Sequence, residues 1–400
     1  MIMRPLAKRV GQLSGEGALA VFGRARELEA EGRDIIHLEL GEPDFHPPAP
    51  VIQAAKAALD AGRDRYAPPA GVPALREALA EYLQRTRGLT IAPGNFIVAP
   101  GCKMILSLCM TAIIERGDEV LYPDPGFPIY PSLIRALGGV PVAFELCEQD
   151  RFQPDTDQIA AKITSRTKAI IFNSPNNPTG TVFDTRILSA LAQLARKHDL
   201  YVIADEIYAR IIYDAQYESI YSQPGMAERT LIIDGFSKSF AMTGWRLGYA
   251  AVPSHMVEAM KLLVVNSYTC ASEFIQCAAV EALHDKGDAV AKMVGEFKNR
   301  RDQFIADLNR IPGFRALPPD GAFYAWVNVE GTGQSAEEVS RMMLEEAGVA
   351  AIPGAAFGAA GKNFIRFAFA TSAALLKKST ERIAGIASKW EPKPQLAGER

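Results

Sequence analysis

Residues 168–205, KAIIFNSPNNPTGTVFDTRILSALAQLARKHDLYVIAD, contain the pattern that decides the fold. An apolar run at 168–173 is followed by a turn-rich segment, an amphipathic stretch at 184–197 and a second apolar run at 201–204. Short apolar runs that alternate with helix-length amphipathic stretches are typical of parallel strands joined by crossover helices. The stretch therefore predicts a β-α-β unit of an α/β fold.

The same alternation extends over much of the chain. Further strands are expected at residues 96–99, 119–122, 140–144, 230–234 and 247–252. A helix-length stretch at 103–116 separates the first two of these. Together with the two runs above, they are enough for one large sheet. We predict an α/β fold in which a large domain holds a mostly parallel seven-stranded sheet.

The chain changes character beyond residue 285. One long charged helix is expected at 287–310, followed by strand and helix patterns in smaller units, which predicts a smaller α+β domain. A helix at 18–31 and a strand at 35–40 are expected to pack against that domain. The predicted boundaries are 47–285 for the large domain, 1–46 with 286–390 for the small domain, and 391–400 for a frayed polar tail.

Composition argues against several classes of protein. The 400 residues are 48% apolar and carry 43 basic and 46 acidic side chains, for a net charge of -3. Nucleic-acid binding normally requires an excess of Lys and Arg on one face, so no nucleic-acid partner is expected. The sequence has no apolar stretch of the roughly 18 residues that span a membrane, and because no apolar run follows the basic residues near its start, we expect no secretory leader. We therefore expect a cytoplasmic protein without a membrane partner.

Three other features offer competing interpretations. The five cysteines show no CxxC spacing and the five histidines are scattered, so we expect buried free thiols and no metal site. GTGQSA at 331–336 fits a dinucleotide-binding pattern, but Ser335 and Glu338 also fit a helix capping box, which we favour. Asp205-Glu206 resembles the acidic motif of ATPases, but no GxxxxGK[ST] loop accompanies it.

Residues 235–249, GFSKSFAMTGWRLGY, contain the strongest candidate for catalysis. The segment follows an expected strand, at the end where α/β sheets present their functional loops. Lys238 lies between two serines and among aromatic and small residues, where an amine loses solvation and tends toward its neutral, nucleophilic form. Taken alone, Lys238 is more simply interpreted as a solvated surface lysine, so a catalytic role depends on which other residues lie near it.

Two other strand ends bring polar groups toward the same edge. SPNNPTG at 174–180 is rich in turn formers and follows one apolar run, while Asp205 and Tyr208 follow the next. In isolation, Asn177 is a turn residue and Asp205 a helix cap. Together with Lys238, they place an amine, a carboxylate, a phenol and an amide at one edge of the sheet.

These motifs, in this order and at these separations, resemble the class I/II aminotransferases of PLP fold type I, the aspartate aminotransferase-like enzymes. The similarity extends from LGEPDF at 40–45 to the region near Trp390. The other matching segments are 66–76, 123–130, 174–180, 205–208 and 235–249, with Arg366 as a further point. The resemblance implies that the cofactor is pyridoxal 5'-phosphate.

The resemblance also assigns the residues around the cofactor ring. Lys238 matches the lysine that holds the cofactor as a Schiff base and moves the proton during catalysis. Asp205 matches the partner of the pyridine nitrogen, where a carboxylate favours the cationic ring that stabilises a carbanion. Tyr208 and Asn177 match the donors to the ring oxygen. Phe127 stands where the family stacks an aromatic ring, and many members have Trp or Tyr there.

The phosphate site is implied in the same way. Gly101-Cys102-Lys103 resembles the phosphate loop at a helix N-terminus, although Cys102 departs from the common pattern. Ser237 and Arg246 match the remaining phosphate ligands. Tyr66 resembles the tyrosine that reaches the phosphate of the neighbouring subunit. That match implies a homodimer with shared active sites.

Substrate binding is expected at Arg366, which matches the arginine that clamps the α-carboxylate through two parallel hydrogen bonds. Gly41 is expected to approach the same carboxylate through its backbone. The implied reaction is a ping-pong transamination that moves the amino group of an L-amino acid to a 2-oxo acid, such as 2-oxoglutarate or pyruvate. Residues 266–270 are either part of the side-chain pocket or a helix-packing segment.

Two other functions share parts of this pattern. A lyase that eliminates a β- or γ-substituent, for example by cleaving a carbon–sulfur bond, would use the same lysine and cofactor. A transcription regulator with a domain of this fold would need a DNA-binding module, and the residues before Ile35 are too few and insufficiently basic. An aminotransferase is the function we expect, with the lyase as the alternative.

Overall fold

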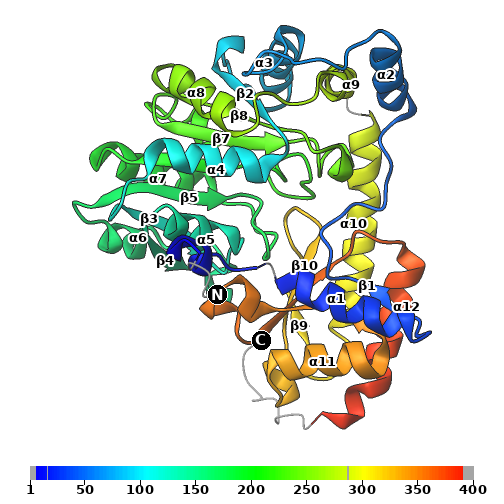
Figure 1. Ribbon diagram of the computed structural model, residues 1–400. Helices are drawn as coiled ribbons and strands as arrows, with labels where there is room; N and C mark the ends of the chain where they lie inside the picture. The colour runs from blue at the N-terminus through cyan, green and yellow to red at the C-terminus, as the bar shows by residue number, and fades with distance from the viewer. Residues whose placement is uncertain (1–5, 16, 286–287, 391–400) are drawn as a thin grey trace, which may run out of the picture.

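The computed structural model describes residues 6–15, 17–285 and 288–390, and its largest element is a seven-stranded sheet (Figure 1). The strand order is β2-β8-β7-β6-β5-β3-β4. Strand β8 runs antiparallel to both neighbours, and the other adjacent strands are parallel. The predicted mostly parallel sheet is confirmed. Its strands are β2 (Phe96–Ala99), β3 (Glu119–Asp124), β4 (Val140–Glu145), β5 (Thr167–Asn173), β6 (Tyr201–Asp205), β7 (Thr230–Gly235) and β8 (Gly248–Ala251).

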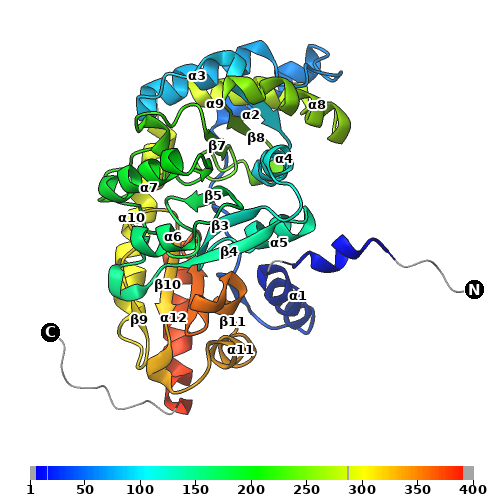
Figure 2. The same ribbon diagram turned by 90° about the vertical axis from the view of Figure 1, so that its left-hand side faces the viewer.

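Helices cover both faces of this sheet (Figure 2). One face packs against α4 (Cys102–Ile113), α5 (Ile129–Ala136) and α8 (Val257–Ser267). The other face packs against α3 (Pro73–Arg87), α6 (Thr156–Lys162), α7 (Thr185–Lys197) and α9 (Glu273–His284), with α2 (Ala49–Asp60) lying on α9. Because both faces are covered, the strands consist of continuous apolar runs without alternation, which is why the sequence marked them clearly.

A second region is built around a four-stranded antiparallel sheet with the order β12-β13-β10-β9. Helix α10 extends from near α2 and α9 down to this sheet (Figure 1). Ser335 accepts a hydrogen bond from the Glu338 amide at 3.2 Å, so the predicted helix cap after 331–334 is confirmed. The elements are α10 (Asp288–Leu308), β9 (Arg315–Ala316), β10 (Tyr324–Asn328), α11 (Ala336–Ala347), β12 (Ile352–Pro353), β13 (Phe364–Ala368) and α12 (Ala373–Ile386).

The N-terminal segment packs against this second region. After α1 (Gly17–Ala30), β1 (Ile36–His37) pairs in parallel with β11 (Val349–Ala350). The strand predicted at 35–40 is therefore too long. Beyond it, the backbone carbonyls of Glu39 and Gly41 accept hydrogen bonds from side chains instead of a neighbouring strand, at 2.6 and 2.5 Å.

Other element ends differ from prediction by a few residues. Helix α4 ends at Ile113 and not at 116, because Ile114 adopts an extended conformation with φ -98° and ψ 126°. In the ranges that the structure describes, no helix is both long and apolar enough to cross a bilayer. The domain boundaries remain a prediction, and the tail at 391–400 lies outside the described residues.

Candidate active site

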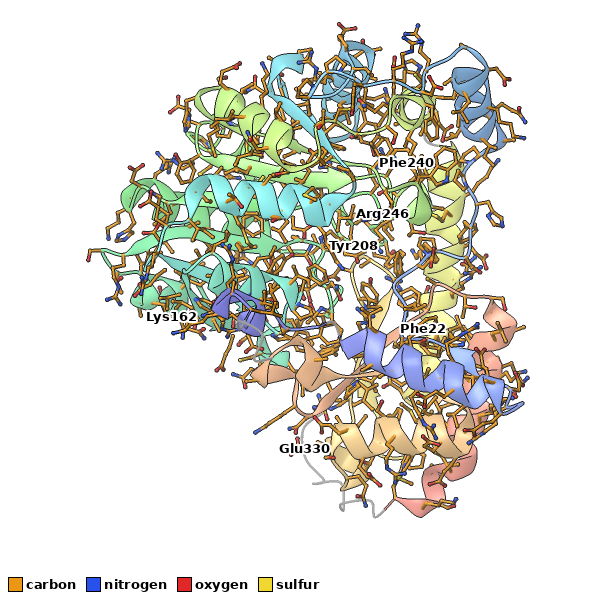
Figure 3. The ribbon with its side chains drawn as sticks, in the orientation of Figure 1. Phe22, Lys162, Tyr208, Phe240, Arg246 and Glu330 are labelled. Atoms are coloured by element: carbon orange, nitrogen blue, oxygen red, sulfur yellow. The ribbon has the colours of Figure 1, made fainter. Side chains whose placement is uncertain are left out.

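A cavity of about 560 Å³ opens at the carboxyl ends of the central strands of the large sheet. This is the edge at which open α/β sheets bind ligands. Figure 3 shows Tyr208 and Arg246 at this edge, facing the region of β10 and α1. The structure brings most of the predicted site residues together, since the lining includes Gly41, Cys102, Lys103, Phe127, Asn177, Asp205, Tyr208, Ser237, Lys238, Arg246 and Arg366.

Two predicted site residues do not line this cavity. Gly101 precedes α4 with φ +88°, and a Cβ there would lie 2.4 Å from Arg246 Nη2, so glycine is needed for the close approach of the guanidinium. Tyr66 is 86% exposed and lies outside the cavity of its own chain. A role for Tyr66 at the phosphate therefore requires a second copy of the chain.

Asp205 is the last residue of β6, beside Asn173 at the end of β5. Its carboxylate accepts hydrogen bonds from Tyr130 Oη at 2.7 Å and from the Ile207 amide at 3.3 Å. Burial raises the pKa of Asp205 to about 6. Sequence reasoning included Tyr130 in a matching segment without giving it a role, because only the position of α5 above the strand end reveals this contact.

Lys238 lies in the turn that follows β7 and is half-buried. Its Nζ donates a hydrogen bond to the carbonyl of Gly41 at 2.5 Å and lines the same cavity as Asp205. Thr243, in the same loop, donates to the carboxylate of Glu42 and so holds residues 41–42 over this loop. The lysine is therefore part of an enclosed site and not a solvated surface residue.

Tyr208 and Asn177 connect the large sheet to the second region. The hydroxyls of Tyr208 and Tyr324 are 2.7 Å apart, and Asn177 Oδ1 accepts a hydrogen bond from Arg366 Nη1 at 3.0 Å. Asn177 also lines the cavity. Tyr324 was missed by sequence reasoning, because it lies in a short apolar strand with no polar motif.

Arg366 is 5% exposed and is held on three sides. Its guanidinium lies 4.3 Å from the ring centre of Tyr324 and 4.8 Å from that of Phe357. Its Nη2 donates to the carbonyl of Glu39 at 2.6 Å. Stacking of this kind fixes the plane of a guanidinium and orients its hydrogen-bonding edge.

The opposite end of the cavity presents backbone amides and cations. Helix α4 begins at Cys102, and the first amides of a helix have no partner within it. A Cβ at Gly248 would lie 2.8 Å from Cys102 N, so glycine allows this helix to approach the sheet closely. Burial raises the pKa of the Cys102 thiol, which therefore stays neutral. The amide of Cys102, and not its side chain, suits an anion.

These residues fit pyridoxal phosphate. The cavity offers an amine at Lys238, a buried carboxylate at Asp205, and a helix N-terminus with Arg246 beside it. Phe127 adds an aromatic face, with its ring edge-on to Tyr130 at 5.6 Å. Across the described parts of the chain, no cluster of three or more His, Cys, Asp or Glu side chains is arranged to hold a metal ion.

The structure bears on two further expectations, one about the cysteines and one about residues 266–270, where it supports the packing alternative. All five cysteines are free, and Cys109 is buried. Cys102, Cys147, Cys270 and Cys277 are partly exposed as residues, although the Cys102 thiol itself is enclosed, so the expectation of buried thiols is wrong for Cys147, Cys270 and Cys277. Residues 266–270 pack against β2 and the segment near Tyr66, through hydrogen bonds from Tyr268 to Val98 at 2.9 Å and from Ala67 to Cys270 at 3.3 Å. They do not line the cavity of this chain.

The sheet topology and a lysine and carboxylate at its strand ends define an enzyme of PLP fold type I. The model of the family described as aminotransferase class I and II matches residues 33–383. The chain belongs to this family and is a PLP-dependent aminotransferase.

Individual relatives agree with this assignment over nearly the whole chain. The aspartate/prephenate aminotransferase of Thermus thermophilus is 40% identical over 96% of this chain and 99% of its own. The aspartate aminotransferase of Pyrococcus horikoshii is 38% identical over 94% of this chain and 96% of its own. The solved structure of the T. thermophilus aspartate aminotransferase with maleate matches with a TM-score of 0.92 and 39% identity, covering 96% of this chain and all 100% of that one. These names favour transamination over the lyase alternative.

Proposed function

We propose that Lys238 attaches to the cofactor and transfers the substrate Cα proton. When bound, pyridoxal phosphate supplies an aldehyde that condenses with amines and a ring that withdraws electrons. The observation that carries the proposal is that Lys238 and Asp205, from different strands, line one cavity. The hydrogen bond from Lys238 Nζ to the carbonyl of Gly41 holds the amine inside this cavity, within reach of a bound substrate.

Asp205 is proposed to hold the pyridine nitrogen. With a pKa of about 6, raised by burial, it is ionised at neutral pH and favours a protonated ring nitrogen. The hydrogen bond from Tyr130 orients the carboxylate. Tyr208 and Asn177 are proposed to donate to the ring oxygen, and Phe127 to cover one face of the ring.

The phosphate is proposed to bind where α4 begins. The amides of the Gly101–Lys103 segment, the hydroxyl of Ser237 and the guanidinium of Arg246 are the proposed ligands. Tyr66 of the partner subunit is proposed to complete this site, and its 86% exposure in the single chain supports that role. The enzyme is accordingly proposed to be a homodimer with shared active sites that works in the cytoplasm.

The substrate α-carboxylate is proposed to bind Arg366, with Gly41 beside it. A Cβ at Gly41 would lie 2.2 Å from the Tyr324 hydroxyl, so only glycine allows this segment to lie over the arginine's ring neighbours. The stacked guanidinium is already oriented, so little side-chain entropy is lost on binding.

We propose an acidic amino acid as the preferred donor and 2-oxoglutarate as an acceptor. The lining also contains the cation Lys103, with its Nζ 6.0 Å from the Phe127 ring centre. A second carboxylate on the substrate could pair with it. The names of the relatives, which include aspartate, and the dicarboxylate maleate in the Thermus structure support this choice.

A panel of amino donors tested against 2-oxoglutarate and pyruvate tests the proposal. Aspartate and glutamate should give the highest kcat/KM, and Lys103→Gln should lower kcat/KM for these donors roughly tenfold while sparing alanine. Lys238→Ala should lose turnover and the yellow absorbance of the bound cofactor together. Product analysis completes the test, because ammonia released with pyruvate would identify a lyase.

A further inference from the structure

A buried ionic cluster lies next to the site but outside the cavity. Arg87, the last residue of α3, contacts Glu206 Oε2 at 2.5 Å through Nη1 and Asp234 through Nη2. The side chains of Arg87, Glu206 and Asp234 are only 2%, 2% and 5% exposed. None of the three belongs to the cavity lining, so the reaction described above does not use them.

The two acids are attached directly to the strand ends that carry the catalytic residues. Glu206 follows Asp205 in the chain, and Asp234 stands four residues before Lys238. The amide of Glu206 donates to the carbonyl of Ile233 at 2.8 Å, which ties the two strand ends together. The carboxylates of the cluster therefore belong to the same two short segments that carry Asp205 and Lys238.

Within the cluster of Arg87, Glu206 and Asp234, the negative charges outnumber the positive charge. Two carboxylates face one guanidinium, and both carboxylates have additional donors. Ser219 donates to Glu206, while Tyr249 Oη and the Gly235 amide donate to Asp234 at 3.0 and 2.6 Å. The remaining titratable or charged groups around Arg87 are Tyr82, Arg210 and Tyr217.

Removing Arg87 would leave this charge uncompensated. Ion pairs buried to this degree are screened weakly, so an unbalanced charge acts over several ångströms. Burial is the main cause that raises the pKa of Asp205, and the negative charges of Asp234 and Glu206 act in the same direction.

We propose that Arg87 is a positioning residue for transamination, whose guanidinium balances Glu206 and Asp234 and thereby sets how tightly the site holds the proton on Lys238. It acts through the two strand ends and touches neither cofactor nor substrate. The inference rests on the proposed roles of Lys238 and Asp205.

Two variants with opposite expected effects test this inference. The measurement is the midpoint of the pH-dependent change in visible absorbance of the cofactor-loaded enzyme, which follows the proton on the Lys238 nitrogen. Arg87→Met adds net negative charge and should raise the midpoint by about one pH unit, whereas Glu206→Gln removes negative charge and should lower it by about half a unit. A purely structural role would not move the midpoint in opposite directions.

Arg85→Met is the matched control, because Arg85 lies on the same helix and binds the carbonyl of Leu283 at 2.7 Å instead of a carboxylate. It should leave the midpoint unchanged, and thermal unfolding should show which variants fold. If Arg87→Met does not fold, the isosteric Glu206→Gln carries the test alone. Unchanged midpoints in folded variants, or shifts of the same sign, would overturn the inference.

The failure of this inference is distinguishable from failure of the proposed function. If Lys238→Ala abolishes the absorbance but the cluster variants titrate like the wild type, the assigned role of Lys238 stands and that of Arg87 falls. If Lys238→Ala keeps the pH-dependent absorbance, the role of Lys238 itself is wrong.

Discussion

The cavity has two walls that are built in different ways. The sheet wall consists of Asp205, which ends strand β6, and of Tyr208 and Lys238, which each follow a strand of the large sheet by three residues. The arginine wall consists of Arg366 with the rings of Tyr324 and Phe357, and it depends on the carbonyl of Glu39, 327 residues away in the sequence. The first wall is shaped by local turns at strand ends, and the second by contacts between distant segments.

This difference separates two functions within one cavity. The proposed ligands of the cofactor lie mainly on the sheet wall, and the proposed ligand of the substrate carboxylate lies on the arginine wall. Asn177 joins them through its hydrogen bond to Arg366. Variants of one wall should therefore change cofactor binding and those of the other should change substrate binding.

The largest effect is expected from Asp205→Asn on the sheet wall. Losing the charge beside the ring should reduce kcat/KM for every donor by roughly 10²–10³-fold. Wild-type cofactor affinity should fall as pH decreases through about 6, where Asp205 takes up a proton, and the variant should lack this dependence. Equilibrium cofactor binding across pH measures both. Asp320→Asn, at another acid whose pKa is raised by burial, should keep the dependence.

Arg366→Leu should weaken substrate binding at the arginine wall and leave cofactor binding at the sheet wall nearly unchanged. The loss of charge-assisted hydrogen bonds to the α-carboxylate should lower kcat/KM by roughly 10- to 100-fold for acidic and neutral donors alike. Cofactor affinity should stay close to the wild-type value. Steady-state kinetics with aspartate and alanine, combined with a cofactor titration, measures the separation. A defect confined to one side-chain class would place Arg366 in the specificity pocket instead.

Tyr66→Phe should weaken cofactor binding at the phosphate, which Tyr66 of the proposed second subunit completes. Loss of one hydroxyl contact should reduce cofactor affinity by about three- to tenfold. Mixed dimers that combine this variant with Lys238→Ala distinguish action in trans from action in cis. In such a dimer, one subunit carries Tyr66→Phe with an intact Lys238, and the other carries Lys238→Ala with an intact Tyr66. If Tyr66 acts across the interface, the site with the intact lysine receives the intact tyrosine and binds cofactor normally.

The smallest effect is expected behind the arginine wall, at His37. Its ring contacts Glu39 Oε1 at 2.7 Å and Glu29 Oε1 at 3.1 Å, and the hydrogen bond to Glu39 is the main cause that raises the pKa of His37 to about 9. The stabilisation is fully present below the ordinary histidine pKa and is lost as pH rises through about 9.

His37→Gln should accordingly lower the free energy of unfolding by about 1 kcal/mol at neutral pH, and by much less above about pH 10. Denaturant unfolding at the two pH values measures the difference. Glu29→Gln, which removes the outer partner alone, should have a smaller effect. An equal loss at both pH values would mean that the protonated ring is not what stabilises this segment.

The two walls also differ in how well the sequence predicted them. The buried strands were evident because each is a continuous apolar run, and Asp205, Tyr208 and Lys238 follow such runs directly. Tyr130 and Tyr324 were not assigned, because their partners lie 75 and 116 residues away and no local pattern marks a phenol as a hydrogen-bond donor to them. The pairing of Arg87 with Glu206 and Asp234 was not predicted for the same reason, because these partners lie 119 and 147 residues away.

The pairing of β1 with β11 has a consequence for the order of synthesis. Residues 36–37 leave the ribosome early but pair with residues 349–350, so this edge stays open until most of the chain has been made. The large sheet, which ends at Ala251, can close before that point. The nascent enzyme can therefore complete its cofactor platform while its N-terminal strand still has an unpaired edge, a state that favours association with other chains.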